Sequence, residues 1–277
     1  MFKRYKPFFR TGVIDFLAYK FSVFSWLLVT IFEVAIVIFL WIAVYKNSSE
    51  GVNSIINGFT FKEMITYLVT ISIFQFVVMD GETLWVINDE IKKGTISSAF
   101  IKPISYRLRF IATTLGSLCI RVLLFGIPLF VIAYIIFYLI DFIEIVSIGL
   151  FIVHLLLFII SIFIASLLND VINYIFGVLC FYTSSGWGIN FIKDVIIGFL
   201  SGTLLPLTFF PDAFKVIINY LPFAGMAYNP VMIVLMKFDL VESIRVILLS
   251  IFWLIILELF AKLLFNRASK KITVQGG

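Results

Sequence analysis

The side-chain types that usually carry out chemistry are sparse in this chain and do not occur at catalytic spacings. His154 is the only histidine, and both cysteines, Cys119 and Cys180, lie inside apolar stretches without a CxxC spacing. Metal sites and proton relays usually need several such groups together. The sequence has neither an HExxH motif nor a GxxxxGK[ST] phosphate-binding loop. These features argue against an enzyme, and we expect no cofactor or metal in this chain.

Two charged residues lie deep within apolar stretches, where a charge needs a partner. Glu33 and Arg121 have apolar runs on both sides, and a charge at the centre of a bilayer costs roughly 3 to over 10 kcal/mol unless it is paired or hydrated. We therefore predict an ion pair between Glu33 and Arg121 across neighbouring helices. The alternative is that one of them lines a substrate path. Glu258 and Lys262 are four residues apart, which predicts an ordinary pair on one helix face.

The composition indicates the medium in which these residues are positioned. Of the 277 residues, 62% are hydrophobic and 13% are charged, whereas a typical soluble domain is about 45–50% apolar and about 25% charged. A soluble chain of this size rarely hides so much apolar surface from water. We therefore predict an all-α integral membrane protein with a single membrane domain, 1–277. The basic residues form short clusters beside apolar runs, so the net charge of +5 does not indicate a nucleic-acid partner.

Apolar runs of about 20 residues, the length that crosses a bilayer as a helix, recur along the chain. We predict about six transmembrane helices, at 21–45, 64–87, 111–140, 145–168, a stretch that includes 194–205, and 246–265. The stretch 171–187 is also apolar and leaves the boundary between the fourth and fifth helices open. Basic clusters lie before the first helix, after the second and after the last. Because such clusters favour the cytoplasmic side, we expect both termini and the loop 88–109 in the cytoplasm, with a bundle over 21–265 and a tail at 266–277.

The first 20 residues precede the first predicted span and have an amphipathic pattern. Phe9, Val13 and Phe16 recur at helical spacing, and Arg10 and Lys20 lie where they can reach lipid head groups. This pattern predicts an interfacial helix over 1–20 that lies on the inner surface of the membrane.

Between the fifth and last predicted spans lies an apolar block that one straight helix cannot cover. Five residues mark its breaks: Gly202, Pro206, Pro211, Pro222 and Pro230. Proline removes a backbone donor and clashes with the preceding turn, so we expect short helices that enter the outer leaflet and rest against protein. The alternative is a plain apolar loop on the outer face.

The loop after the second predicted span has the features of a docking element. Gly94 lets the chain turn away from the span, and Pro103 ends whatever helix follows. Between them we predict a coupling helix of about two turns over 95–102, with Phe100 or Ile101 as an apolar anchor for a partner. The complete set of candidate contact residues is Asp89, Glu90, Lys92, Lys93, Gly94, Thr95, Phe100, Ile101 and Pro103. The alternative is an ordinary basic cytoplasmic loop.

Three segments resemble the permeases of type-2 ABC exporters, in particular the short, six-span bacterial subgroup. The first is the loop from Glu90 to Ser105, EIKKGTISSAFIKPIS. The second is LSGTLLPL at 200–207, followed by Phe210-Pro211, and the third is LPF at 221–223, followed by Asn229-Pro230. The order and spacing of the segments also fit, and the resemblance covers nearly the whole chain.

The resemblance implies a division of labour between subunits. Separate ABC ATPase subunits would bind ATP and Mg²⁺ in the cytoplasm, and the loop 88–109 would receive their movement. The non-catalytic permease would pair with a second copy or a similar permease, among the lipids of the bacterial cytoplasmic membrane. It would export an amphipathic, peptide, lipid-like or drug-like substrate. Two other classes stay open, a secondary transporter and a small accessory or immunity membrane protein without ATP coupling.

Overall fold

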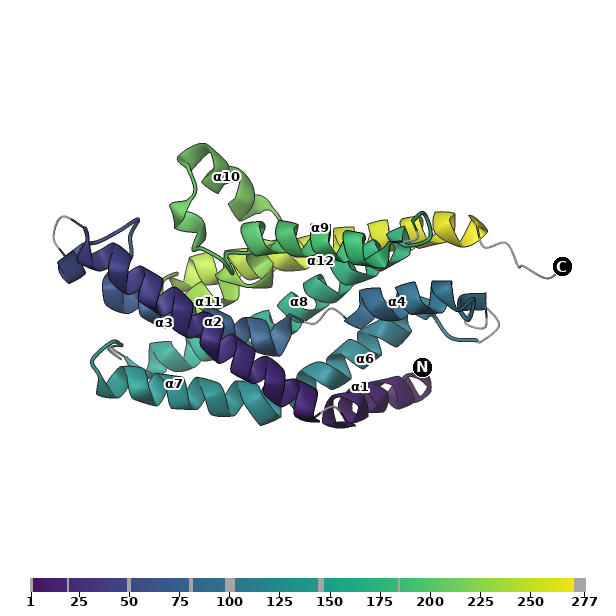
Figure 1. Ribbon diagram of the computed structural model, residues 1–277, viewed down its shortest axis with the longest axis horizontal. Helices are drawn as coiled ribbons and strands as arrows, with labels where there is room; N and C mark the ends of the chain where they lie inside the picture. Colours follow the sequence, from purple (N-terminus) through teal and green to yellow (C-terminus); the bar gives the residue numbers. More distant parts are fainter. Residues whose placement is uncertain are drawn as a thin grey trace.

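Within the residues that the structure describes, every regular element is a helix (Figure 1). The computed structural model describes residues 2–18, 20–48, 51–79, 82–97, 103–143, 147–183 and 185–271. The longer helices are α1 (Lys6–Ala18), α2 (Lys20–Lys46), α3 (Phe61–Val78), α4 (Glu82–Lys92), α6 (Tyr106–Arg121), α7 (Ile127–Leu139), α8 (Ile148–Leu179), α9 (Gly186–Leu200) and α12 (Leu240–Ala268). The shorter ones are η1 (Phe2–Arg4), η2 (Gly51–Asn53), the π-helical η3 (Val122–Gly126), η4 (Leu207–Phe209), α10 (Asp212–Tyr220), η5 (Ala224–Met226), α11 (Tyr228–Val234) and η6 (Ser269–Lys271).

Five helical stretches of the described chain are long and apolar enough to cross a membrane. They are Phe21–Lys46, Phe61–Lys92, Tyr106–Leu139, Ile148–Leu179 and Leu240–Ala268. They correspond to five of the predicted spans, and the prediction of an all-α integral membrane protein is confirmed. The remaining span corresponds to α9, whose 15 residues fall short of the about 20 that cross a bilayer. The apolar stretch 171–187 mostly continues α8, which ends at Leu179 before α9 begins at Gly186.

Polar residues directly before the first helical residue determine where several helices begin. The Thr60 hydroxyl accepts a hydrogen bond from the Glu63 N–H at 3.3 Å, and the Glu63 carboxylate accepts one from the Thr60 N–H at 2.9 Å. These two bonds form a capping box at the start of α3. Ser105, Ser147 and Asp239 each accept one such bond at the starts of α6, α8 and α12. Each cap satisfies a backbone donor that the first turn leaves unpaired.

Helix α8 packs against α3, α4, α6, α9, α11 and α12, and its contacts fix the directions of its neighbours. Phe74 of α3 contacts Phe158, and Thr83 of α4 bonds to Asp170 further along α8. From the first contact to the second, the residue numbers increase in α3–α4 and in α8 alike, so α3 and α4 run parallel to α8. Phe130 of α7 also contacts Phe158, whereas α6, which precedes α7, meets α8 at Asp170. The stretch α6–α7 therefore runs antiparallel to α8.

The direction of α12 follows from two contacts at its ends. Just before α12, the Phe238 carbonyl lies 3.1 Å from Nε2 of His154, near the start of α8. Towards the other end, the ring of Phe265 lies 5.9 Å from that of Tyr174. Helices α8 and α12 are therefore parallel neighbours, as α8 and α3–α4 are.

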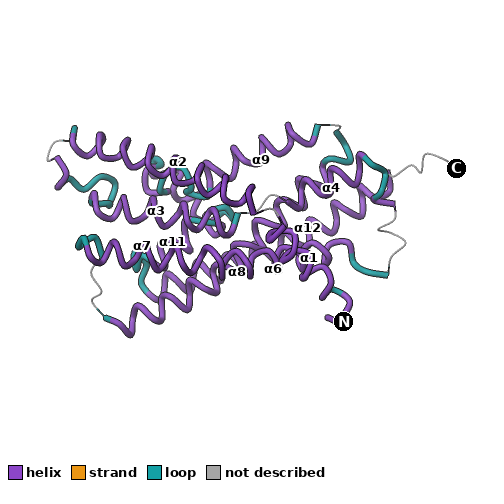
Figure 2. The backbone as a smooth tube through the Cα atoms, turned by 60° about the horizontal axis from the view of Figure 1, so that its bottom comes forward, coloured by secondary structure: helices purple, strands orange, loops and turns teal. Residues whose placement is uncertain are grey.

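Because successive long helices alternate in direction, several chain segments meet at one end of the molecule. Helix α1, the last turns of α4 and α12 and the first turn of α6 lie together, at the right of Figures 1 and 2. We call this the terminal end. Element η2, the start of α3 and the last turn of α7 lie at the opposite, distal end. The first and last described helices and the two described ends of the connection between α4 and α6 thus share one end of the bundle.

The proline-containing block forms a chain of short helices, as predicted. Pro206 and Pro211 directly precede η4 and α10, Pro222 follows the end of α10, and Pro230 lies in the first turn of α11. Gly202 has a φ of +84°, a conformation that side chains other than glycine rarely adopt. All seven residues of α11 are buried, so this part of the block rests against protein.

Helix α1 packs lengthwise along α6. Gly12 and Gly116 form the crossing. A Cβ atom at Gly116 would lie 2.0 Å from the Phe9 carbonyl oxygen, and one at Gly12 would lie 2.2 Å from the Thr113 carbonyl oxygen. Small residues at such positions let two helix backbones approach closely. One face of α1 is therefore held against a protein partner, α6.

The close approach of α1 and α6 predicts that Gly116→Ala destabilises the protein. Alanine gains about 0.5–1 kcal/mol of helix propensity, but the strain of separating two backbones costs about 1–3 kcal/mol. We expect a lower melting temperature in detergent. Gly198→Ala is the control, because its Cβ would meet nothing closer than 3.5 Å. Equal stability of the two variants would show that α1 is not tightly docked.

Candidate functional site at the terminal end

The predicted docking loop leaves the bundle at Gly94. This residue has a φ of +69°, so the chain turns sharply after α4. Lys92, Lys93 and Thr95 are exposed, and Ile96, which is helical, is buried. Pro103 is exposed on the far side of the loop, whereas Phe100 and Ile101 lie outside the described residues. The described part of the loop therefore presents basic and small residues at the terminal end.

The carboxylate of Glu90 points towards α6 and closes the base of this loop. The two terminal guanidinium nitrogens of Arg109, Nη1 and Nη2, each donate to this carboxylate at 2.9 Å, and the Tyr106 hydroxyl donates to it at 2.7 Å. Asp89, by contrast, forms an exposed 2.7 Å pair with Lys93. Of the acidic residues predicted to contact a partner, Asp89 is at the surface and Glu90 joins α4 to α6.

A second, deeper ion-pair group surrounds Arg107 at the first turn of α6. One guanidinium nitrogen donates to Asp170 of α8 at 2.6 Å, and the other two donate to Glu258 of α12 at 2.6 and 3.0 Å. The Asp170 side chain is only 1% exposed. Its second oxygen accepts bonds from the hydroxyls of Thr83 on α4 and Thr114 on α6. The Asp170 carboxylate therefore has three donors on two helices.

Aromatic rings enclose both groups of charges. The Tyr106 ring stacks on Phe265 of α12 with centroids 5.0 Å apart. The guanidinium of Arg107 lies 4.8 Å from the Tyr174 ring, and that of Arg109 lies 4.5 Å from the Phe110 ring. Cations over ring faces are attracted by the ring quadrupole, which adds to the ion pairs.

We call the eight polar residues of these two groups the basal network. Its members are Thr83, Glu90, Tyr106, Arg107, Arg109, Thr114, Asp170 and Glu258. The network joins α4, α6, α8 and α12 beneath the loop that connects α4 to α6. Because buried charges that lose a partner are strongly destabilising, these four helices should move together at this end.

Sequence reasoning did not find the basal network. It counted Arg107 and Arg109 only as positive charges of a loop, and it paired Glu258 with Lys262 on one helix face. In the structure Glu258 instead receives Arg107 from α6. The available signal was Asp170, an acidic residue between two apolar stretches of one long helix, which required a cation from elsewhere.

The structure does not bring Glu33 and Arg121 together. Glu33 is exposed on α2, which packs chiefly on α3, and no ion pair joins Glu33 to another described residue. Arg121 is buried on α6, next to the π-helical turn η3, and donates to the Ser117 carbonyl and hydroxyl at 3.3 Å. The predicted pair fails because the helices that carry the two charges are not close neighbours.

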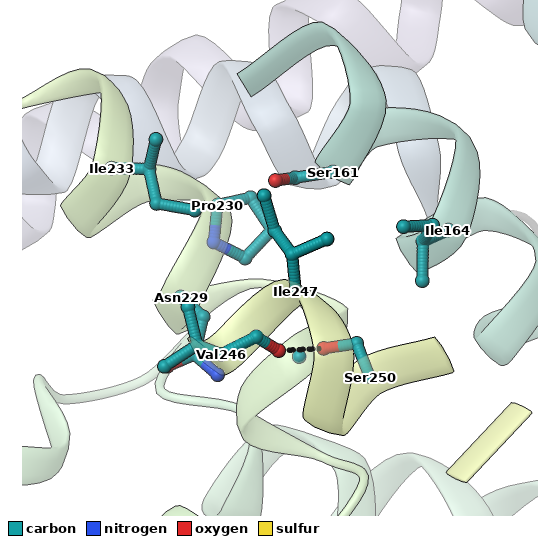
Figure 3. A pocket seen from close by; sticks show the side chains of 9 residues that line it. Ser161, Ile164, Asn229, Pro230, Ile233, Val246, Ile247 and Ser250 are labelled. Atoms are coloured by element: carbon teal, nitrogen blue, oxygen red, sulfur yellow. Dashed lines mark hydrogen bonds between the residues drawn. The ribbon is translucent and has the colours of Figure 1, made fainter. Parts of the chain in front are cut away.

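A small cavity lies between α8, α11 and α12 (Figure 3). Its lining is mainly apolar and uncharged: Ser161, Ile164, Gly225, Asn229, Pro230, Ile233, Val246, Ile247 and Ser250. The Ser250 hydroxyl is already bonded to the Val246 carbonyl, at 2.8 Å. The cavity is far smaller than the roughly 300 Å³ at which ligand pockets usually begin. Nor do the described residues group three His, Cys, Asp or Glu side chains that could hold a metal ion.

The basal network predicts a strong effect of removing its central cation. Arg107→Met would leave Asp170 and Glu258 without their cation, so we expect a loss of about 3–5 kcal/mol in unfolding free energy. Lys93→Met is the control, because it breaks the exposed pair with Asp89, which contributes about 0–1 kcal/mol. Thermal unfolding in detergent compares the two. Similar melting temperatures would show that the Arg107 cluster does not hold the helices together.

Comparison with known protein families connects this geometry with a function. Residues 28–276 match a family described as ABC-2 family transporter protein. The match takes in the basal network, the loop after α4 and the proline-containing block, and it begins after α1. Comparisons with curated proteins and with solved structures found no match. The chain belongs to the ABC-2 transporter family and is a membrane subunit of an ABC transporter.

Proposed function

We propose that this chain is the permease half of an ATP-driven exporter whose ATP and Mg²⁺ are bound by separate ABC ATPase subunits. The ATPase subunits dock at the terminal end, on the loop 93–105. The observation that carries this proposal is the basal network, which ties both ends of that loop to α8 and α12. The sequence has no phosphate-binding loop, which fits a hydrolytic site in another polypeptide.

Movement of the loop would reach the membrane through the basal network. Glu90 and Arg109 hold α4 and α6 together directly below the loop. Arg107 passes the same displacement to α8 through Asp170 and to α12 through Glu258. Two of these helices are long enough to cross the membrane and the other two belong to spanning stretches. A push at the loop therefore tilts a connected set of helices. The exposed pair Asp89–Lys93 and the basic Lys92 would orient the docked subunit.

The terminal end would face the cytoplasm of a bacterial cell, in the cytoplasmic membrane. It carries the basic clusters of the first turns, of the α4–α6 loop and of the end of α12, and such clusters favour the cytoplasmic side. The distal end would then carry the proline-containing block towards the outside.

A second permease, either a copy of this chain or a similar one, would complete the translocation path. Among the α2 side chains whose burial is described, only Trp41 and Tyr45 are buried, so most of this surface is available to lipid or to that partner. The exposed surface of the spans is apolar and aromatic, which suits amphipathic, peptide, lipid-like or drug-like substrates. A secondary transporter or an accessory protein would have the same kind of surface but no ATPase dependence.

Disrupting the predicted anchor of the docking loop should uncouple the permease from its ATPase. We expect Phe100→Asp with Ile101→Asp to insert and fold normally but to lose the ATPase subunit during gentle purification, because the new charges oppose burial at the interface. Val52→Asp with Ile55→Asp is the matched control, since both are exposed at the distal end. Full assembly and full cargo-stimulated hydrolysis in the Phe100/Ile101 variant would reject the docking proposal.

The proposed orientation predicts which residues a membrane-impermeant thiol reagent can reach in intact cells. The two native cysteines are first removed by Cys119→Ser and Cys180→Ser, so that only the introduced cysteine can be labelled. Burial raises the pKa of the Cys180 thiol, which already lowers its reactivity. We expect labelling of Asn53→Cys at the distal end and none of Ser97→Cys or Ser269→Cys. Labelling of Ser97→Cys from outside would reverse the orientation.

A further inference from the structure

Helix α1 and the turn before it carry four cations that have no anionic partner among the residues that the structure describes. Lys3, Arg4, Lys6 and Arg10 are all exposed, and no ion pair joins any of them to another described residue. Asp15 is the only acidic residue in α1. Four uncompensated cations within two turns repel one another, so they favour a surface that supplies negative charge.

The apolar residues that follow indicate that this surface is a membrane. Ile14 and Leu17 of α1 are 49% and 38% exposed, and Phe21 and Phe24 at the start of α2 are 84% and 56% exposed. Exposed side chains thus change from basic to apolar along the chain, near Arg10. Cations followed along the chain by exposed apolar side chains match the boundary between the head groups and the acyl chains of a bilayer.

The same helix holds the far end of the loop between α4 and α6. The Ser105 N–H donates to the Tyr5 hydroxyl oxygen at 3.0 Å, and Ser105 is the residue that caps α6. Gly12 and Gly116 then lock α1 onto α6. Further along, the ring of Phe16 meets that of Phe125, in the π-helical turn η3, at 5.9 Å. Helix α1 therefore follows α6 from its first residue to its end.

We propose that the basic cluster of residues 3–10 binds the head groups of anionic phospholipids, and that α1, held in this way, sets the position of Ser105 and the docking loop. Each cation close to an anionic bilayer gains about fivefold in affinity, so loss of three weakens binding roughly a hundredfold. The lipid contact stands by itself, whereas its effect on transport rests on the proposed docking of an ATPase at this loop. Residues 1–27 precede the family match, so most of this device is additional to the matched region.

The lipid contact is tested on the permease in nanodiscs of phosphatidylcholine, with and without an equal part of phosphatidylglycerol. We expect phosphatidylglycerol to raise the melting temperature of the unmodified chain. The variant Lys3→Gln, Lys6→Gln, Arg10→Gln should lose this rise. The control Lys262→Gln, Lys270→Gln, Arg267→Gln removes the same charges from exposed positions near the end of α12 and should keep it. The proposal would be overturned if phosphatidylglycerol did not raise the melting temperature of the unmodified chain, or if it raised that of the first variant equally. Loss of the ATPase from the first variant in phosphatidylcholine alone would also overturn it, because this result would identify a protein partner.

The link from lipid to docking loop is tested with Tyr5→Phe, which removes only the acceptor for the Ser105 N–H. This variant should keep the rise in melting temperature but lose the stimulation of cargo-dependent ATP hydrolysis by phosphatidylglycerol in the assembled complex. Retained stimulation would show that α1 does not position the loop. If the unmodified complex shows no cargo-dependent hydrolysis in either lipid, the docking proposal fails, while the melting experiment still decides the lipid contact.

Discussion

The carboxylate of Asp170 is the constraint on which the terminal half of the bundle depends. Asp170 belongs to the long apolar helix α8, and its side chain has almost no exposed surface. A charge buried in this way must be compensated by a partner. Arg107 compensates it, and Glu258 in turn balances Arg107 on the other side. Because these residues come from three helices, satisfying one buried charge fixes the relative positions of α6, α8 and α12.

Other features of this end follow from that arrangement. Arg107 is in the first turn of α6, so holding it in the bundle keeps the preceding loop close to the end of α4, where Glu90 receives Arg109. The parallel course of α3–α4, α8 and α12 brings their last turns to the same end (Figure 1). Helices α2 and α9 contribute no residue to the network. Helix α9 is instead joined to α8 by the buried Lys193, whose ammonium donates to the Asn173 side-chain oxygen at 2.7 Å, and α2 packs on α3.

Local and periodic features were predictable from the sequence, and the pairing of distant charges was not. Length and hydropathy identified five spans, and the prolines at 206, 211, 222 and 230 predicted the broken block, because each acts within one turn of its own position. The partners of Glu33 and Arg121 were predicted wrongly, since depth in an apolar run says nothing about which helices are neighbours. Arg107 was taken for a loop charge because its partners are 63 and 151 residues away. The fifth span was the least predictable, since α9 is short and continues into proline-broken turns.

We propose that the basal network carries movement from the docking loop into the spans, and this movement can be followed by a distance measurement across the distal end. The labelled positions would be Val52, after α2, and Ile148, the first residue of α8. Both residues are exposed, so each can carry a spin label. In the assembled complex, trapping the ATPase in its closed state should change the distance between them. With Arg107→Lys, which keeps the charge but cannot bridge Asp170 and Glu258 in the same fork geometry, the change should be lost while the ATPase stays bound. A full distance change in Arg107→Lys would show that the basal network does not carry this movement.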